Sequence, residues 1–210
     1  MTYTIIGVDP GKRYLGIASA SGSIAVGSRV LWAKYPYAAV ATQAYTNPAL
    51  GPLIISLVEK GYSAREALEK ALKTDNEHHL RQVAVLTLGG GKAVYNGENI
   101  PREHGYFIGN YSVCIANLVV NPELAETICS VFEEYLLDTD SLKDFAFSLL
   151  EGLKTGHSMG GDKRGDRSAA ILIVGRTPYD SLYDRLIDLR VDYSTEPVEM
   201  LRDITEKYLG

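Results

Sequence analysis

The chain has 210 residues, of which 46% are hydrophobic and 22% are charged, and this composition excludes a disordered protein. Its net charge is −5, so the chain lacks the excess of basic residues that is typical of nucleic-acid-binding proteins, and we expect no nucleic-acid partner. No apolar run is long enough to span a bilayer, and residues 1–9 do not resemble a signal peptide, so we expect a cytoplasmic protein without membrane contact.

The first half of the chain predicts several strands followed by two helices. Hydrophobic periodicity gives strands over 3–8, 14–20 and 38–44, and helices over 49–60 and from Ser63 onward. Ser63 and Glu66 form a capping box, and Leu68 and Leu72 lie on the apolar stripe of this second helix. A short strand near 24–31 stays open.

The second half predicts strands and helices in alternating groups. A strand over 81–88 turns at Gly89–Gly91 into a hairpin with 92–96. The remaining elements are a strand, two helices, two strands and a final helix: 111–119, Asn121 to about Asp138, Ser141 to about Lys154, 168–174, 184–191, and from Ser194 or Thr195.

The order of these elements indicates the fold class. It lacks the strict alternation of strand and helix that a doubly wound parallel sheet requires. Residues 38–44, 113–120 and 169–174 are apolar without polar alternation, so both faces of these strands are expected to be covered. We therefore predict one α+β domain over 1–210, a four-layer αββα sandwich of two mainly antiparallel sheets covered by helices.

A charged, glycine-rich loop precedes the apolar strand 168–174. Loop residues at the mouth of a buried strand are well placed to bind a ligand. The backbone N–H groups of Gly160, Gly161 and Asp162 suit an anion nest or oxyanion hole. Arg164 suits a carboxylate, with Ser168 organising substrate, although a plain turn in which Arg164 pairs with Asp162 stays open.

Three polar residues fall within apolar strands. Thr42 and Gln43 end one strand and Asn117 lies inside another. Buried polar side chains need hydrogen-bond partners, so these residues either line a pocket or tie core backbone together. We expect Asn117 to contact substrate or an oxyanion, and we favour the core-tying role for Gln43.

The two cysteines and four histidines indicate no metal site. Cys114 and Cys129 are flanked by apolar residues and are expected to be buried free thiols in a reducing compartment. No Cys/His spacing matches a zinc site, and no nucleotide-binding motif is present. We therefore expect neither metal nor cofactor, while a homo-oligomer stays open.

Ile5–Arg13, followed by Gly16-Ile17-Ala18, resembles the opening of RuvC-like resolvases. In that family the aspartate at the end of the first strand, here Asp9, binds metal. The resemblance covers about fifteen residues and implies a metal-dependent nuclease, whose chemistry needs several carboxylates at one point.

A second resemblance covers nearly the whole chain. Six blocks carry it: Ala41–Gly51, Arg81–Val85, Asn117–Leu118, Gly160–Gly165, Ser168–Ala170 and Asp188–Asp192. They are similar to an uncharacterised conserved family of the Ntn-hydrolase superfamily (domain of unknown function, family 1028). This resemblance implies the αββα sandwich, in agreement with the order of elements.

The second resemblance also implies a chemistry. Ntn hydrolases use the side chain of their first mature residue as nucleophile, and its α-amino group, with a pKa of about 8, as base. Removal of Met1 would make Thr2 that residue. Arg29 and Lys34 are the candidates for the basic residue that tunes the amine.

Three functions therefore stay open. The first is hydrolysis of a small amide by Thr2, with Asn117 and Gly160–Asp162 stabilising charge. The second is a non-catalytic Ntn-like protein that binds a small anionic ligand at the 160–168 loop. The third is a RuvC-like nuclease with metal at Asp9.

Overall fold

The computed structural model describes residues 2–136, 141–179 and 182–210. The strands are β1 (Thr2–Val8), β2 (Tyr14–Ser21), β3 (Leu31–Lys34), β4 (Ala38–Ala44), β5 (Arg81–Thr87), β6 (Lys92–Asn96), β7 (His104–Ile108), β8 (Ser112–Asn117), β9 (Ser168–Gly175) and β10 (Arg185–Val191). The helices are α1 (Leu50–Glu59), α2 (Ala64–Leu72), α3 (Leu124–Leu136), α4 (Leu142–Ser158) and α5 (Pro197–Leu209), with short 3₁₀ helices at Val26–Ser28 and His78–Leu80.

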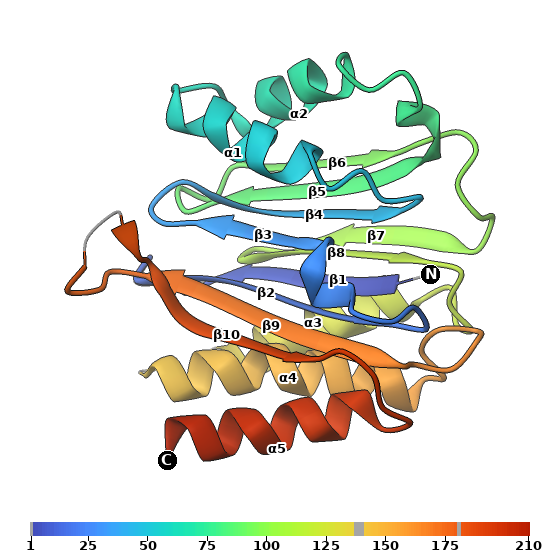
Figure 1. Cartoon of the computed structure of the whole chain (residues 1–210), viewed down its shortest axis with the longest axis vertical. Helices are drawn as coiled ribbons and strands as arrows, with labels where there is room; N and C mark the ends of the chain where they lie inside the picture. The colour runs from blue at the N-terminus through green and yellow to red at the C-terminus, as the bar shows by residue number, and fades with distance from the viewer. Residues whose placement is uncertain (1, 137–140, 180–181) are drawn as a thin grey trace.

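The strands form two stacked antiparallel sheets (Figure 1). The six-stranded sheet has the order β10-β9-β2-β1-β8-β7, and the four-stranded sheet has the order β3-β4-β5-β6. Helices α1 and α2 cover the outer face of the four-stranded sheet, while α3, α4 and α5 lie on the other side of the molecule, against the six-stranded sheet. The predicted four-layer αββα sandwich is confirmed.

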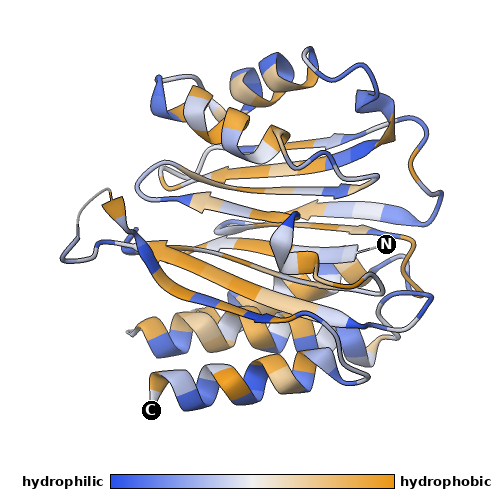
Figure 2. Ribbon diagram, viewed as in Figure 1, coloured by the Kyte–Doolittle hydropathy of each residue, from blue (hydrophilic) through white to orange (hydrophobic). Residues whose placement is uncertain are grey.

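Each interface between layers has its own hydrophobic cluster. Ile6, Ile17 and Leu86 belong to the cluster between the sheets, whereas Ile54 and Phe132 belong to the clusters under the two helical layers. The central strands are largely apolar, and the helices alternate between apolar and polar residues (Figure 2). Burial of one helical face against a sheet is the expected source of their stability.

Two edge strands were not predicted. The region near 24–31 forms a 3₁₀ helix, and strand β3 begins only at Leu31. Strand β7 alternates exposed and partly buried residues and contains Gly105, so its apolar run is limited to the three residues Tyr106–Ile108. Both strands lie at the edge of a sheet, where burial imposes the weakest pattern on the sequence.

Element ends differ from the predictions by a few residues. The strand predicted to reach residue 119 ends at Asn117, because Leu118 takes a left-handed φ of 53°. The last helix begins at Pro197, a residue suited to the first helical turn. Helix α4 runs to Ser158, and the predicted end of the preceding helix near Asp138 lies outside the described residues.

Two glycines let aromatic rings approach the six-stranded sheet. Gly7 and Gly16 lie opposite each other in the β1–β2 register. A Cβ atom on Gly7 would lie 2.3 Å from Phe132 Cζ, and one on Gly16 would lie 2.8 Å from Phe145 Cε1. The two rings meet edge to face at 6.1 Å. These glycines of the RuvC-like opening therefore serve helix packing.

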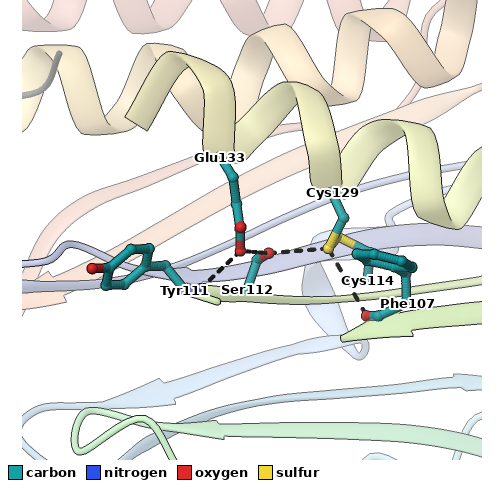
Figure 3. The surroundings of a disulfide bond; sticks show 6 residues. All are labelled: Phe107, Tyr111, Ser112, Cys114, Cys129 and Glu133. Atoms are coloured by element: carbon teal, nitrogen blue, oxygen red, sulfur yellow. Dashed lines mark hydrogen bonds between the residues drawn. A yellow bond between two sulfur atoms is a disulfide. The ribbon is translucent and has the colours of Figure 1, made fainter. Parts of the chain in front are cut away.

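The prediction of free thiols is wrong. Cys114 of β8 and Cys129 of α3 form a disulfide that joins the six-stranded sheet to its covering helix (Figure 3). Ser112 Oγ lies 3.0 Å from Cys129 Sγ and donates to Glu133 Oε1 at 2.6 Å. Apolar neighbours fit a buried disulfide as well as a buried thiol, and the argument for a reducing compartment no longer holds.

Within the described parts of the chain, no helix is both long and apolar enough to cross a bilayer.

The disulfide predicts a redox-dependent stability. Cys114 and Cys129 are 15 residues apart, and closing a loop of that length stabilises a protein by about 3 kcal/mol. We expect reduction to lower the free energy of unfolding by about that amount in denaturant titrations. A double variant with alanine at both positions is the control and should not respond to reductant. Equal unfolding midpoints for fully reduced and oxidised protein would contradict the prediction.

Candidate functional site

Polar side chains replace apolar ones at one end of the interface between the two sheets. They come from β1, β2, β8 and β9 of the six-stranded sheet and from β4 and β5 of the four-stranded sheet. All are buried: Thr2, Thr4, Ser19, Ser21, Gln43, Gln82, Asn117 and Ser168. Because buried polar groups need partners, this end of the sandwich is a hydrogen-bonded network.

Thr2 is the first residue of β1, a central strand, and is 5% exposed. Its hydroxyl donates a 3.1 Å hydrogen bond to Ser21 Oγ on the neighbouring strand β2. Both side chains line a pocket of about 290 Å³, which we call the Thr2 pocket. Its walls are completed by the segments after β2 and β4: Ser23, Val26, Arg29, Val30, Ala44, Tyr45 and Thr46.

Arg29 gives the Thr2 pocket its charge. Of the described residues that line the pocket, only Arg29 carries a formal charge. Its Nη2 donates to Ile24 O at 3.0 Å. Lys34, the other sequence candidate for a basic residue near Thr2, instead pairs with Glu59 of α1 at 2.8 Å. Of these two candidates, Arg29 is therefore the one that lines the Thr2 pocket.

Gln43 connects the two sheets beneath Thr2. Its Nε2 donates to Thr2 O at 3.1 Å and to Gln82 Oε1 at 2.7 Å, and its Oε1 accepts from Thr4 Oγ1 at 2.7 Å. Gln82 in turn donates to the carbonyl of Ala116 in β8 at 3.1 Å. Gln43 thus ties core backbone together and also holds the strand that carries Thr2.

Asn117 lies beside Thr2 but outside the pocket. The two residues are opposite each other in the β1–β8 register, and Asn117 is fully buried. Its Nδ2 donates to Gln82 Oε1 at 3.0 Å. Ser21 lies on the pocket side of Thr2, and Asn117 lies on the opposite side.

The glycine-rich loop uses its N–H groups internally. Gly160 N donates to His157 O and Gly161 N to Gly156 O, both at 3.0 Å, and Asp162 N donates to Asp166 Oδ1 at 3.1 Å. Gly160 and Gly161 have φ angles of +100° and +52°, which suit glycine. An oxyanion hole at this loop would require these three N–H groups to break their present hydrogen bonds.

The same loop supports a wall of the Thr2 pocket. Asp162, whose carboxylate is buried, accepts from Gly22 N at 2.6 Å and from Arg164 Nη2 at 3.1 Å. Ser168 Oγ donates to Ser23 O at 2.6 Å and accepts from Val26 N at 3.0 Å. The predicted pairing of Arg164 with Asp162 is present, and the loop holds the segment 22–26 in place.

A second buried carboxylate anchors the loop from behind. Asp166 Oδ2 accepts from Tyr3 Oη at 2.7 Å and lies 2.8 Å from His157 Nδ1. Burial, and then the nearby Asp166 carboxylate, raise the pKa of Tyr3 well above its usual value. Tyr3 thus remains a neutral donor that fixes β1 from its helix-facing side.

A polar cluster on the other face of β4 holds the opposite wall. Thr42 Oγ1 donates to Asn47 O at 3.1 Å, and Asn47 Nδ2 donates to Asp75 Oδ2 at 2.9 Å. Arg81 pairs with Asp75 at 2.8 Å and donates from Nη1 to Tyr45 O at 2.7 Å. Thr42 therefore lies outside the pocket and supports the turn 44–47.

Strained backbone surrounds this site. Ala25, Ala44 and Leu118 have φ angles of 57°, 68° and 53°, values that cost non-glycine residues free energy. Ala44 lines the Thr2 pocket, Ala25 belongs to the segment around it, and Leu118 follows Asn117.

The sequence did not predict Ser21 and Tyr45 as pocket residues, because only the folded sheets bring the two turns together.

Asp9 has a structural role at the far end of β1. Its carboxylate accepts from Arg13 Nε at 2.9 Å and from Tyr14 N at 2.6 Å, which closes the β1–β2 hairpin. No group of three or more His, Cys, Asp or Glu side chains able to hold a metal ion occurs among the described residues. Within the part of the chain that the structure describes, Asp9 therefore has no cluster of partner acids of the kind that two-metal cleavage needs.

The Asp75–Arg81 pair predicts acid sensitivity of the 44–47 wall. Hydrogen bonds from Arg81 lower the pKa of Asp75 to about 2, below its usual value near 4. The ionised Asp75 therefore contributes fully to the free energy of unfolding above pH 4, and this contribution is lost as the pH falls toward 2. We expect Asp75→Asn to lower the free energy of unfolding by on the order of 2 kcal/mol at pH 7 and by little at pH 2.

Denaturant titrations at pH 7, 4 and 2 measure this difference. Glu77→Gln is the matched control, because Glu77 contacts the same Arg81 but its side chain is 65% exposed, and exposed pairs contribute little. An Asp75→Asn effect that stays constant from pH 7 to pH 2 would contradict the assignment.

Comparison with known proteins places the chain in a family. A family model described as "Family of unknown function (DUF1028)" matches residues 2–201. Protein SPO2555 from Silicibacter pomeroyi, with the same family model, shares the fold: the TM-score is 0.85 and the identity 23%, over 100% of this chain and 86% of that chain. Anbu (ancestral beta-subunit) from Yersinia bercovieri has 12% identity and a TM-score of 0.48, over 99% of this chain and 94% of that chain. No curated protein matches the chain. The chain thus belongs to the family of unknown function DUF1028, and it shares its fold with SPO2555.

Proposed function

We propose that the protein is an N-terminal-nucleophile amidohydrolase that acts on a small, negatively charged amide. The observation that carries this proposal is the position of Thr2. It begins a central strand, its hydroxyl lies in a pocket, and that hydroxyl is hydrogen-bonded to Ser21. Cleavage of the peptide bond before Thr2 supplies the free α-amino group that the chemistry needs.

The reaction needs no residue other than Thr2 as nucleophile and base. Thr2 Oγ1 attacks the amide carbonyl carbon while the α-amino group takes the hydroxyl proton. The C–N bond then breaks, and that proton passes to the departing nitrogen. Water hydrolyses the resulting ester through the same base, which releases a carboxylic acid and restores the Thr2 hydroxyl.

The Thr2 pocket supports a small substrate with a negative charge. Its volume of about 290 Å³ is at the lower end of the range for small-molecule sites, which favours a short acyl group. The guanidinium of Arg29 is the charged group on its wall and matches a carboxylate in charge and geometry. Tyr45, 61% exposed, lies on the opposite wall, in the turn after β4.

Ligand binding at the 160–168 loop without catalysis is the alternative, and it has less support. Two buried carboxylates, Asp162 and Asp166, lie in this loop and disfavour an anion there. Arg164 makes contacts with Asp162 and Ser23 within the protein. These observations favour the Thr2 pocket as the site for an anionic ligand.

Covalent trapping tests the nucleophile. A small β-lactone acylates a reactive hydroxyl by ring opening and adds its full mass to the protein. We expect protein that begins at Thr2 to gain one adduct on Thr2, because the neighbouring amine activates the hydroxyl. Thr2→Ala should lower the labelling rate by at least about 1,000-fold, while Thr2→Ser retains labelling.

Thr127→Ala is the matched control, because Thr127 lies on α3, its hydroxyl donates to the carbonyl of Glu123 just before that helix, and Thr127 does not belong to the described lining of the Thr2 pocket. Its labelling should equal that of the wild type in intact-mass and peptide-mapping measurements. Equal labelling of Thr2→Ala and wild type, or an adduct confined to another residue, would refute the proposed nucleophile.

A further inference from the structure

One buried carbonyl oxygen beside the site has no hydrogen-bond donor in the described parts of the chain. Among the described residues, the buried side-chain atoms without a partner are Asn117 Oδ1 and Arg202 Nε. Asn117 is fully buried, whereas the side chain of Arg202 is 34% exposed and its Nη2 binds Glu151. A buried acceptor without a donor is costly, so Asn117 Oδ1 requires an explanation.

The orientation of the Asn117 amide follows from its neighbours. Gln82 Nε2 donates to the backbone carbonyls of Gly105 and Ala116 at 3.3 and 3.1 Å. This leaves Gln82 Oε1 as an acceptor, so the group of Asn117 that faces it must be the donor Nδ2, at 3.0 Å. The amide of Asn117 is therefore not interchangeable with its flipped form, and Oδ1 is the atom that remains unpaired.

The backbone nitrogen of Thr2 is directed toward Asn117. Val8 N donates to Tyr111 O at 2.9 Å, and hydrogen-bonded pairs recur every second residue in an antiparallel ladder. Thr2 lies six residues before Val8 in an unbroken register, so its nitrogen points toward β8, where Asn117 is its opposite residue. Side chains of opposite residues lie on one face, within contact distance.

We infer that Asn117 Oδ1 accepts a hydrogen bond from the α-amino group of Thr2 once the preceding peptide bond is cleaved. This inference rests on the proposed function, because it requires that free amine. A backbone amide has one N–H to give to the strand ladder, whereas a free amine has further donors for Oδ1. Asn117 is then a positioning residue that holds the base on the β8 side while Ser21 holds the hydroxyl on the β2 side.

A substrate group is a weaker partner for this oxygen. Asn117 does not belong to the described lining of the Thr2 pocket, and Thr2 lies between it and Ser21. A ligand in the pocket therefore meets the Thr2 hydroxyl and Arg29 before it reaches Asn117. The neighbouring Thr2 amine needs no such path.

The pKa of the Thr2 amine is the measurable consequence. An Asn117→Asp substitution keeps the shape of the side chain but replaces Nδ2, which faces Gln82 Oε1, with an oxygen. Its carboxylate form places a charge at the acceptor and should raise the pKa of the amine by about 1 to 3 units. Asn117→Ala removes the acceptor and should lower that pKa. Protein that begins at Thr2, with isotopically labelled threonine, allows the titration to be followed by NMR.

Other charged and titratable groups near the amine define the controls. Among the described residues they are Arg29 and Tyr45 in the pocket, Asp162, which accepts from Gly22 N, and His104, which lies opposite Asn117 in the β7–β8 register. His104→Gln removes the imidazole that lies opposite Asn117 on strand β7. Asn96→Asp is the matched charge control, because Asn96 binds Gln82 in the same network but on the distant strand β6, and it should give a smaller shift.

Two outcomes would overturn the inference. One is a pKa of the Thr2 amine that equals the wild-type value in Asn117→Ala and does not exceed the Asn96→Asp value in Asn117→Asp. The other, which needs no variant, is a crystal structure of protein beginning at Thr2 in which the amine nitrogen lies more than 3.5 Å from Asn117 Oδ1. If β-lactone labelling of Thr2 persists alongside either result, only the role of Asn117 fails; loss of labelling removes the proposed function.

Discussion

The central constraint on this molecule is the need to satisfy polar groups buried between two sheets. Most of that interface is apolar and closes by hydrophobic contact, but one end carries hydroxyl and amide side chains from both sheets. Gln43 spans the gap, with bonds to Thr2 O, Thr4 Oγ1 and Gln82. A shift of one sheet against the other breaks several of these bonds at once, so the network fixes the relative position of the sheets and of Thr2.

The same constraint shapes the two pocket walls, each of which depends on a buried carboxylate. Asp162 holds the segment after β2 through Gly22 N, and Asp75 holds the turn after β4 through Arg81 and Asn47. Neither carboxylate lines the pocket. The two carboxylates thus lie behind the pocket walls, and the pocket itself presents hydroxyl groups and the guanidinium of Arg29. The strained backbone at Ala25 and Ala44 is consistent with turns held by such anchors.

Sequence patterns predicted the layers better than the site. Apolar strands and capped helices follow from local periodicity, so the αββα sandwich was accessible, whereas the edge strands β3 and β7 were not. The Cys114–Cys129 disulfide was missed because pairing depends on how α3 packs on β8, which no local pattern encodes. Among polar residues, burial identified Gln43 and Asn117 as members of a network, but not which face of each strand they occupy. Thr2 came from the family resemblance, while Ser21 and Arg29 meet it only through the fold.

The proposed chemistry requires a free α-amino group on Thr2 in the natural protein. The direct measurement is the intact mass and N-terminal residue of the protein purified from its native host. We expect a chain that begins at Thr2, without methionine before it, because the hydroxyl of Thr2 in the pocket needs the adjacent amine as its base. A population that uniformly retains Met1 would contradict the proposed role of Thr2, since a peptide nitrogen cannot accept the hydroxyl proton.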